Sequence, residues 1–355
     1  MSTPRLEIDL TKIESNILEL IRLFGEKKVS VFAVTKVVCG NLDIAHLLVR
    51  SGVKVIADSK LENLRAMRQG KVRAELLLLG PPKMSEVKAV VQYSDMSLNT
   101  EITIIKRLSR FALKLGVNHK IVLMVECGDL REGILPENLL KFVSEVLPLK
   151  GVTLIGIGTN LGCFGGVHPD QENMELLSTK ASQIESEFGI QLSIISGGNS
   201  ANYLWFINET DIGRVNNLRL GESIFLGRET TEQKRIPGLF VDAFTLVAEV
   251  TELKLKPISP NGKIIPNGYR DPVFHGETGE MHRAILGMGK QDVIISGLTP
   301  IKRMNVIGGS SDHTIINQNE EALQVGSEVR FNLNYAALLS AMTSPYVQKT
   351  ILPTK

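Results

Sequence analysis

Short apolar runs alternate with longer amphipathic stretches over the first two thirds of the chain. The runs are rich in β-branched residues or in Leu, and the stretches between them repeat apolar residues with helical spacing, for example at Leu108, Phe111 and Leu115. We count eight runs, at residues 29–36, 53–58, 74–80, 95–99, 120–126, 152–158, 192–198 and 216–227. This alternation predicts repeated strand–helix units around a parallel sheet.

The number of units favours a closed barrel. Eight strand–helix pairs in roughly 230 residues fit the size of a TIM (β/α)8 barrel better than that of a doubly wound sheet, and an open six-stranded sheet is the alternative. After residues 235–238 ("RIPG") the pattern changes, and the remaining runs are typical of strands separated by Gly, Pro and Asn clusters. We therefore expect an α/β fold with a barrel at 1–235 and a mostly-β domain at 236–355.

Composition narrows the range of partners. The 355 residues are 43% hydrophobic, enough for a sizeable core, and the formal net charge is +2 without a Lys/Arg-rich block. Nucleic acid is therefore not an expected partner, whereas small molecules or a second copy of the chain are. The three cysteines show no CxxC spacing, the N-terminus has no apolar leader segment, and no run is long enough to cross a bilayer. These features indicate a cytoplasmic protein without disulfides, zinc or membrane contact.

Polar and charged residues follow several of the predicted strands. Active sites of such barrels lie at the carboxyl ends of the strands. The residues at these ends are Lys36 after the first strand, Arg131 after the fifth, Thr159 and Asn160 after the sixth, 196–200 ("SGGNS") after the seventh, and Arg219 with Gly221 in the eighth. A lysine, two arginines and a Gly/Ser loop at one mouth predict a site for an anionic, phosphorylated ligand.

Each of these elements also has a purely structural interpretation. Lys36 could be a solvated strand end or an ion-pair partner, and Arg131 a surface charge. The 196–200 segment could be an ordinary strand-to-helix turn with Ser200 as the helix N-cap. The glycines of 162–166 ("GCFGG") are interpreted as a loop only.

A lysine beside a phosphate-binding loop suggests a Schiff base with pyridoxal 5′-phosphate. An amine that is buried among cationic groups is shifted toward its neutral, nucleophilic form, and Arg131 and Arg219 would supply that environment for Lys36.

The motifs that carry these residues occur in order along almost the whole chain. They are "EIDLTKIESNI", "AVTKVVCG", "ADSKLENL", "ECGDLREGI", "GIGTNL", "SGGNSAN", "NLRLGESIFLGRET", "IPGLFVDAFTL", "GGSSDH" and "AMTSPYV". Together they resemble the alanine racemase family of pyridoxal-phosphate enzymes, and most of all its ornithine racemase subgroup. The resemblance implies a TIM barrel with a C-terminal β domain and an amino-acid racemase activity.

The resemblance also implies roles for single residues. Lys36 would hold the cofactor and act as one acid/base, and Arg219 would meet the pyridine nitrogen. A guanidinium at that place makes the ring a weaker electron sink than a carboxylate would, which suits racemisation. Arg131 matches an arginine near the phenolic oxygen, and Asn160 replaces a histidine that stacks near the ring in alanine racemases.

The phosphate would lie between the last two strand ends. Ser200 and the backbone amides around Gly198 and at Gly221 and Glu222 correspond to the family's phosphate cradle. The cofactor-binding residues that we expect in this part of the barrel are Ser196, Asn199, Ser200, Gly221 and Glu222.

Racemisation needs a proton donor on each face of Cα, and Lys36 serves one face. In alanine racemases the second is a tyrosine of the partner's β domain. Tyr269 lies at a similar spacing, although the motif around it matches poorly, and Asp312 and His313 are further candidates. Gly40 replaces a phosphate-binding tyrosine of the alanine enzymes, so Tyr346 is a candidate for that hydroxyl.

Completion of the site in trans implies a homodimer with C2 symmetry. A diamino acid such as ornithine would also need a carboxylate for its distal ammonium, for which Asp312 and Glu132 are candidates. Racemisation of alanine or lysine remains an alternative.

Three other activities are less consistent with the sequence. Pyridoxal-phosphate binding proteins without turnover share this barrel but lack a β domain. Decarboxylases of the same plan carry a cysteine motif in the C-terminal part, whereas Cys163 is the last cysteine here. A metal-dependent hydrolase would need paired histidines, and the six histidines show no such spacing, so no metal is expected.

Overall fold

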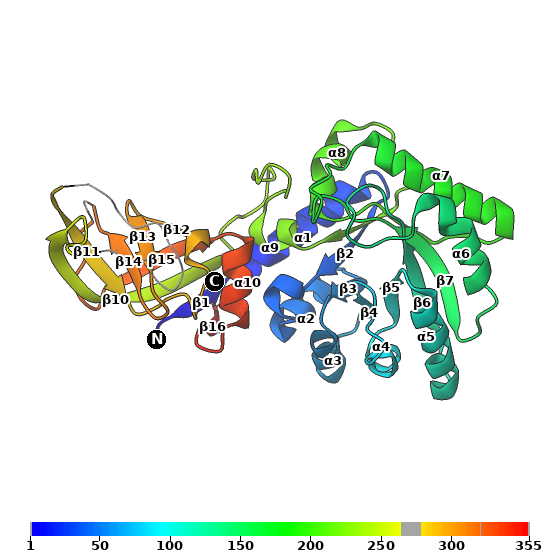
Figure 1. Cartoon of the computed structure of the whole chain (residues 1–355), viewed down its shortest axis with the longest axis horizontal. Coiled ribbons are helices and arrows are strands. Elements are labelled where there is room, and N and C mark those ends of the chain that lie inside the picture. Colours follow the sequence, from blue (N-terminus) through cyan, green and yellow to red (C-terminus); the bar gives the residue numbers. More distant parts are fainter. Residues whose placement is uncertain (1, 264–277, 320, 354–355) are drawn as a thin grey trace. The chain divides into compact units, whose positions relative to one another are not determined.

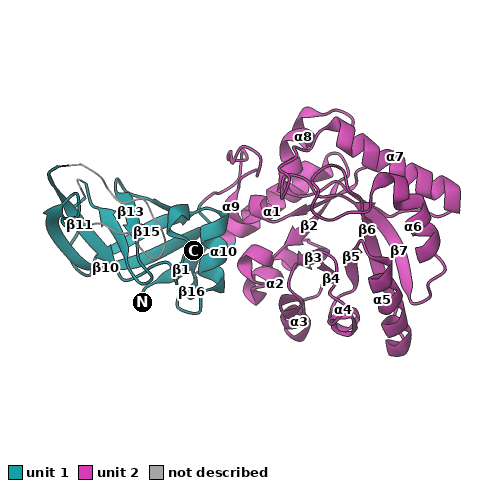
Figure 2. Cartoon of the chain, in the orientation of Figure 1, with its two compact units in different colours: residues 1–10, 242–355 teal, residues 11–241 magenta. Residues whose placement is uncertain are grey.

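The computed structural model describes residues 2–263, 278–319 and 321–353. Within them the chain forms two compact units, one of residues 11–241 and one of residues 1–10 and 242–355 (Figure 2). Each unit has its own sheet system, and the first carries the predicted strand-end residues.

The unit at 11–241 is a closed barrel of eight parallel strands. Its strands are β2 (Ser30–Val34), β3 (Val55–Asp58), β4 (Glu75–Leu78), β5 (Met96–Asn99), β6 (His119–Met124), β7 (Val152–Gly158), β8 (Ile194–Ser196) and β9 (Asn217–Leu220), paired in this order. The barrel closes where β2 pairs with β9. The predicted barrel is confirmed, and the open six-stranded sheet was wrong.

Helices alternate with these strands (Figure 1). They are α1 (Leu10–Gly25), α2 (Leu42–Arg50), α3 (Leu61–Gln69), α4 (Val87–Tyr93), α5 (Ile102–Leu115), α6 (Leu139–Val146), α7 (Gln171–Phe188), α8 (Tyr203–Asn208) and α9 (Glu222–Leu226). Short 3₁₀ turns lie at Lys36–Val38 (η1), Pro136–Asn138 (η2) and Ser200–Asn202 (η3). The helices bury one apolar face, as Leu108 and Ala112 do in α5, and this amphipathic pattern is what made them predictable.

The eighth predicted strand was too long. The run 216–227 contains the strand β9, which ends at Leu220, and then the helix α9. Gly221 separates the two, and a Cβ at this glycine would lie 3.1 Å from the carbonyl oxygen of Val34. The close approach of β9 to the end of β2 therefore leaves little room for a side chain at the position where strand changes to helix.

The second unit is a mostly antiparallel β domain. Its strands are β1 (Arg5–Ile8), β10 (Phe244–Pro257), β11 (Glu280–Leu286), β12 (Leu298–Pro300), β13 (Asn305–Gly309), β14 (Thr314–Asn317), β15 (Glu328–Leu333) and β16 (Gln348–Ile351). A 3₁₀ turn, η4 (Ile295–Gly297), and a helix, α10 (Tyr335–Thr343), lie between them. The strand order is β12-β15-β10-β11-β14-β13, with β1 on β10 and β16 on β1.

The boundary of this unit differs from the predicted division at 235/236. The β domain begins at Asp242 and also contains the first ten residues, because β1 pairs with β10 and β16. Charged side chains strengthen the attachment of β1. Arg5 donates two hydrogen bonds of 2.7 Å to Glu328, and Arg330 donates one of 2.6 Å to Glu7. The N-terminal strand therefore belongs to the β domain and not to the barrel.

Burial lowers the pKa of His119, at the start of β6, to about 4. The residue is 2% exposed, and its Nε2 lies 2.9 Å from the Ser97 hydroxyl. In the unfolded chain His119 would take up a proton near pH 6.5, whereas in the folded barrel it stays neutral until the pH approaches 4. The stability that neutral His119 contributes is present above pH 6.5 and is lost as the pH falls toward 4.

We therefore expect the wild-type barrel to lose up to about 3 kcal/mol more stability between pH 6.5 and 4 than a His119→Gln variant. Urea unfolding measures this difference, with fluorescence of Trp205, the chain's single tryptophan, as a probe within the barrel. Equal loss of stability in both proteins would contradict a neutral, buried His119.

Candidate active site

Lys36 leaves the barrel wall at the carboxyl end of β2. It is the first residue of η1, it is exposed, and it follows the fully buried Thr35. Burial raises the pKa of the Glu222 carboxyl, and the Lys36 ammonium is one of the groups that oppose this shift. Lys36 and Glu222, 186 positions apart in the sequence, are therefore electrostatic neighbours at the barrel mouth.

Arg219 is a buried guanidinium on the inner side of β9. Its side chain donates to the hydroxyl of Ser196 and, at 2.7 Å, to the carbonyl oxygen of Thr159. Burial lowers the pKa of Arg219 to about 10, with the nearby Arg131 adding to the effect and Glu132 opposing it. Arg219 therefore remains charged at neutral pH while both of these acceptors are neutral.

The 196–200 segment is a tight loop that ends in η3. Gly198 has φ +142°, and a Cβ at this position would overlap the Asn202 carboxamide. Asn199, not Ser200, is the N-cap, since its Oδ1 accepts from the Ala201 amide at 2.8 Å. The alternative interpretation, in which Ser200 is the helix N-cap, was therefore wrong.

Ser200 instead turns toward the neighbouring strand end. Its hydroxyl lies 3.0 Å from the hydroxyl of Ser223 in α9, and the Ser223 amide donates to it at 3.3 Å. This contact joins the loop after β8 to the turn after β9. Two hydroxyl groups and the backbone of Gly198 and Gly221 thus lie in adjacent segments, as an oxyanion cradle requires.

Arg131 is the centre of a second cluster. Its guanidinium forms a two-pronged ion pair with Glu132 and donates to Cys163 Sγ at 2.9 Å. The Asn160 carboxamide lies 3.3 Å from the guanidinium and 3.1 Å from the Asn199 side-chain amide. Through Asn160 and Asn199, the cluster is connected to the loop after β8.

Asp129 connects the loop after β6 to the loop after β7 by hydrogen bonds. Its buried carboxylate accepts hydrogen bonds from the amides of Cys163, Phe164 and Val167, at 3.3, 2.9 and 3.3 Å. The 162–166 segment, interpreted from sequence as a loop only, is indeed a loop, and it also supplies Cys163 to Arg131. Sequence reasoning missed Asp129, although an aspartate two residues before Arg131 in a Gly-containing strand end was a usable signal.

The remaining predicted residues belong to the β domain. Asp312 and His313 are exposed between β13 and β14, with His313 Nδ1 3.2 Å from Asp312 Oδ1, and hydroxyl groups of Ser310 and Ser311 lower the Asp312 pKa. Tyr346 is 65% exposed. Tyr269 lies outside the described residues.

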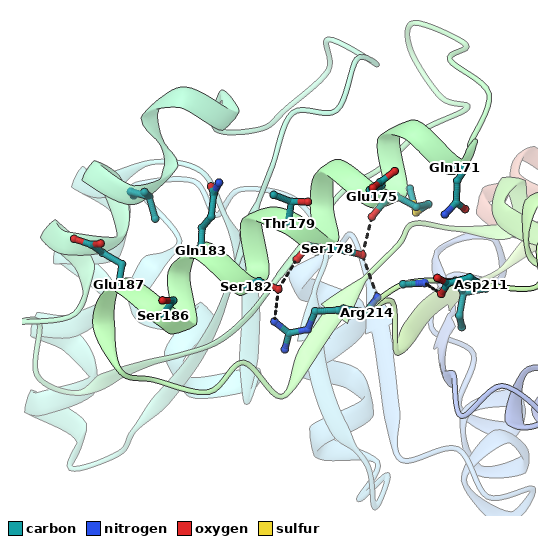
Figure 3. A pocket seen from close by; sticks show the side chains of 14 residues that line it. Gln171, Glu175, Ser178, Thr179, Ser182, Gln183, Ser186, Glu187, Asp211 and Arg214 are labelled. Atoms are coloured by element: carbon teal, nitrogen blue, oxygen red, sulfur yellow. Dashed lines mark hydrogen bonds between the residues drawn. The ribbon is translucent and has the colours of Figure 1, made fainter.

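A groove of about 750 Å³ lies elsewhere on the barrel, along α7 and residues 211–214 (Figure 3). None of the predicted site residues lines it. Ser178 donates to the Met174 carbonyl and accepts from the Arg214 amide, while Arg214 pairs with Glu185 at 2.7 Å. Ser178 and Arg214 therefore already have hydrogen-bond or ion-pair partners within the barrel.

The described residues contain neither a metal-ligand cluster nor a membrane-spanning helix. No group of three or more His, Cys, Asp or Glu side chains there could hold a metal ion. Nor is any helix of the described segments both long and apolar enough to span a membrane.

The chain is similar to known racemases over its whole length. The profile of the alanine racemase N-terminal domain matches residues 8–229. An ornithine racemase from Acetoanaerobium sticklandii is 36% identical over 354 residues, covering 98% of this chain and 99% of that protein. A lysine racemase from Thermotoga maritima is 34% identical over 356 residues, covering all of both chains.

Solved structures support the fold. An alanine racemase from Streptomyces lavendulae superposes with a TM-score of 0.77 at 15% identity, covering 100% of this chain and 99% of that one. The barrel and the β domain therefore occur together in that structure as they do here.

The role of Asp129 can be tested by amide hydrogen exchange. Asp129→Ala removes the acceptor of three amides, and loss of a hydrogen bond to a charged group costs about 1.5–3 kcal/mol. We expect the amides of residues 163, 164 and 167 to exchange at least about tenfold faster. Asp170→Ala, which removes the N-cap acceptor of α7, is the matched control. Unchanged exchange at 163–167 in Asp129→Ala would show that Asp129 does not hold the loop.

Proposed function

The chain belongs to the alanine racemase family, and we propose that it interconverts L- and D-ornithine with pyridoxal 5′-phosphate held by Lys36. It is an amino-acid racemase, as its relatives over the full length are. The observation that carries the cofactor assignment is the buried, charged Arg219, with neutral acceptors Ser196 and Thr159, at the same barrel mouth as the strand-end Lys36.

The residues at the mouth fit this cofactor. Gly198 requires glycine, because its φ is positive and a Cβ would overlap Asn202, and Gly221 leaves little room for a Cβ beside Val34. Neither position carries a side chain that would cover its backbone amide. Ser200 and Ser223 add hydroxyl groups at the same place, and Glu222 adds its backbone amide. When bound, pyridoxal phosphate would withdraw electrons from Cα and so make its proton easier to remove.

The residues around the ring would tune and orient this chemistry. Arg219 would donate a hydrogen bond to the pyridine nitrogen. Because the guanidinium keeps its proton, the pyridine nitrogen would stay unprotonated, and the ring would withdraw electrons less strongly. Ser196 holds Arg219 in place by accepting from it. Arg131 would donate to the phenolic oxygen, while Asn160 and Asn199 connect Arg131 to the phosphate loop.

Lys36 would carry the proton on one face of Cα. The second donor would come from the β domain of a partner subunit, with Tyr269 as first candidate and His313, beside Asp312, as the alternative. Such an arrangement requires a homodimer, and a C2 dimer completes both sites at once. Tyr346 would supply a further hydroxyl to the phosphate.

The substrate assignment rests on the relatives. Ornithine carries a distal ammonium, for which the carboxylates of Glu132 and Asp312 are the proposed partners. Lysine is the second candidate, since a relative named lysine racemase matches the whole chain and lysine is longer by one methylene group. The three free cysteines support a reducing, cytoplasmic location.

The first test combines spectroscopy with optical rotation. We expect a visible absorbance band that borohydride abolishes, a reduced adduct mapped by mass spectrometry to Lys36, and loss of optical rotation of L-ornithine. Lys36→Ala should lower the rate at least about 10²-fold, while Lys54→Ala, a lysine at the amino end of β3, should not.

An adduct at Lys36 without loss of rotation of ornithine, lysine or alanine would instead support a binding protein without turnover. An adduct at another lysine, or none, would overturn the cofactor assignment.

The second test identifies the opposite proton donor. Deuterium exchange at Cα is followed separately from L- and D-ornithine in Tyr269→Phe and His313→Gln. The residue that serves the second face should, when replaced, slow exchange from one enantiomer by about 10²- to 10⁴-fold and spare the other. Normal exchange from both enantiomers would remove that residue from the mechanism.

A further inference from the structure

The turn that carries Lys36 has an unusual backbone. Thr35 has φ −92° and ψ 4°, in the sparsely populated bridge region, and Cys39 has φ +51°, in the left-handed region. A non-glycine residue in the left-handed region costs about 1–3 kcal/mol and persists only where surrounding contacts offset that cost. The structure around residues 35–40 must therefore supply contacts that hold this turn.

Asp58 supplies the first contact. It is the last residue of β3, it is 0% exposed, and its Oδ2 accepts from the Thr35 hydroxyl at 2.7 Å. The Thr35 amide also donates to the carbonyl oxygen of Ala57 at 2.9 Å. The residue directly before Lys36 is thus held by both its backbone and its side chain.

The second contact lies at the other end of the turn. A Cβ at Gly40, which has φ +61°, would lie 2.7 Å from Asn63 Cβ and 3.0 Å from Met67 Cε in α3. Asn63 in turn donates to Asp58 Oδ1 at 3.0 Å. Asp58 therefore bonds one end of the turn directly and fixes the residue that the other end packs against.

The carboxylate is kept in this position at an electrostatic cost. Burial raises the pKa of Asp58, and the hydrogen bonds from the Lys60 amide, Thr35 and Asn63 only partly oppose that effect. These three donors are uncharged groups, so no ion pair with them offsets the desolvation. If Asp58 only anchored the start of α3, the hydrogen bonds from Lys60 and Asn63 to its Oδ1 would be sufficient. The bond from Thr35 to Oδ2 is additional and connects Asp58 to the Lys36 turn.

We propose that Asp58 is a positioning residue for Lys36: by holding Thr35 and Asn63, it sets the direction in which Lys36 leaves β2. It touches neither cofactor nor substrate, and it acts through the backbone of the turn. The proposal rests on the proposed function in so far as Lys36 is the reacting amine.

The sharpest variant is Thr35→Val. Valine keeps the β-branched shape, removes the hydroxyl donor, and leaves the Asp58 bonds to Lys60 and Asn63 in place. Misplacement of a reacting group by about 1 Å can cost about 10²-fold in rate. We expect kcat to fall about 10- to 100-fold with KM little changed, and the pH midpoint of the cofactor absorbance band to shift.

Two comparisons separate positioning from stability. Thr35→Ser restores the hydroxyl and should recover kcat and the pH midpoint. Asp58→Asn should resemble Thr35→Val, whereas Asp95→Asn should not. Asp95 accepts from the Leu76 amide and from Arg68, both at 2.7 Å, just before β5 and so at the amino end of the barrel. Wild-type kcat and pH midpoint in Thr35→Val would overturn the proposal, and so would a Thr35→Ser variant as impaired as Thr35→Val.

A further readout does not depend on the cofactor. In protein without pyridoxal phosphate, the acetylation rate of Lys36 relative to Lys54 is measured by mass spectrometry. Thr35→Val and Asp58→Asn should change this ratio, and Thr35→Ser and Asp95→Asn should not. If the wild type holds no cofactor on Lys36, the proposed function fails while this ratio still decides whether Asp58 positions the lysine. An unchanged ratio in Thr35→Val would count against that role.

Discussion

Closure of the barrel between β2 and β9 is the constraint on which the site depends. Phe32 pairs with Arg219 and Ala33 with Leu220, across more than 180 positions of sequence. The pairing brings Gly221 against the carbonyl oxygen of Val34 and makes Lys36 and Glu222 electrostatic neighbours. Without this closure, the lysine and the guanidinium would lie at opposite edges of an open sheet.

Once the strands are closed, charge balance decides how the mouth is organised. Burial lowers the pKa of Arg219, Glu132 opposes that shift while pairing with Arg131, and repulsion by Arg131 adds to it. Asp129 and Asn160 then fix the loops that surround Arg131. The cations at the mouth thus lie among carboxylates from its own loops, with Glu132 paired to Arg131 and Asp129 bonded to backbone amides.

Features that depend on residues close together in the sequence could be predicted, whereas contacts between distant residues could not. Each barrel strand is a local apolar run, so all eight strands could be predicted. Lys36, Arg131 and Arg219 were selected as candidate site residues because they lie at or near the ends of predicted strands. The membership of β1 in the β domain was not predictable, because its partners Val247 and Gln348 lie more than 240 positions away. The same holds for Thr35 with Asp58 and for Ser200 with Ser223, whose contacts arise only after neighbouring strands pair.

The place of β1 has a consequence for biosynthesis. In chain order, the barrel at residues 11–241 interrupts the β domain. The first strand to leave the ribosome, β1, therefore cannot pair until residues 244–247 and 348–351 have been synthesised. The barrel has every strand it needs by residue 220 and can close during translation, whereas the β domain stays incomplete until nearly the whole chain exists. A chain that ends before residue 348 would lack β16, the strand that pairs with β1 in parallel, and so could not complete the β domain even with all eight barrel strands present.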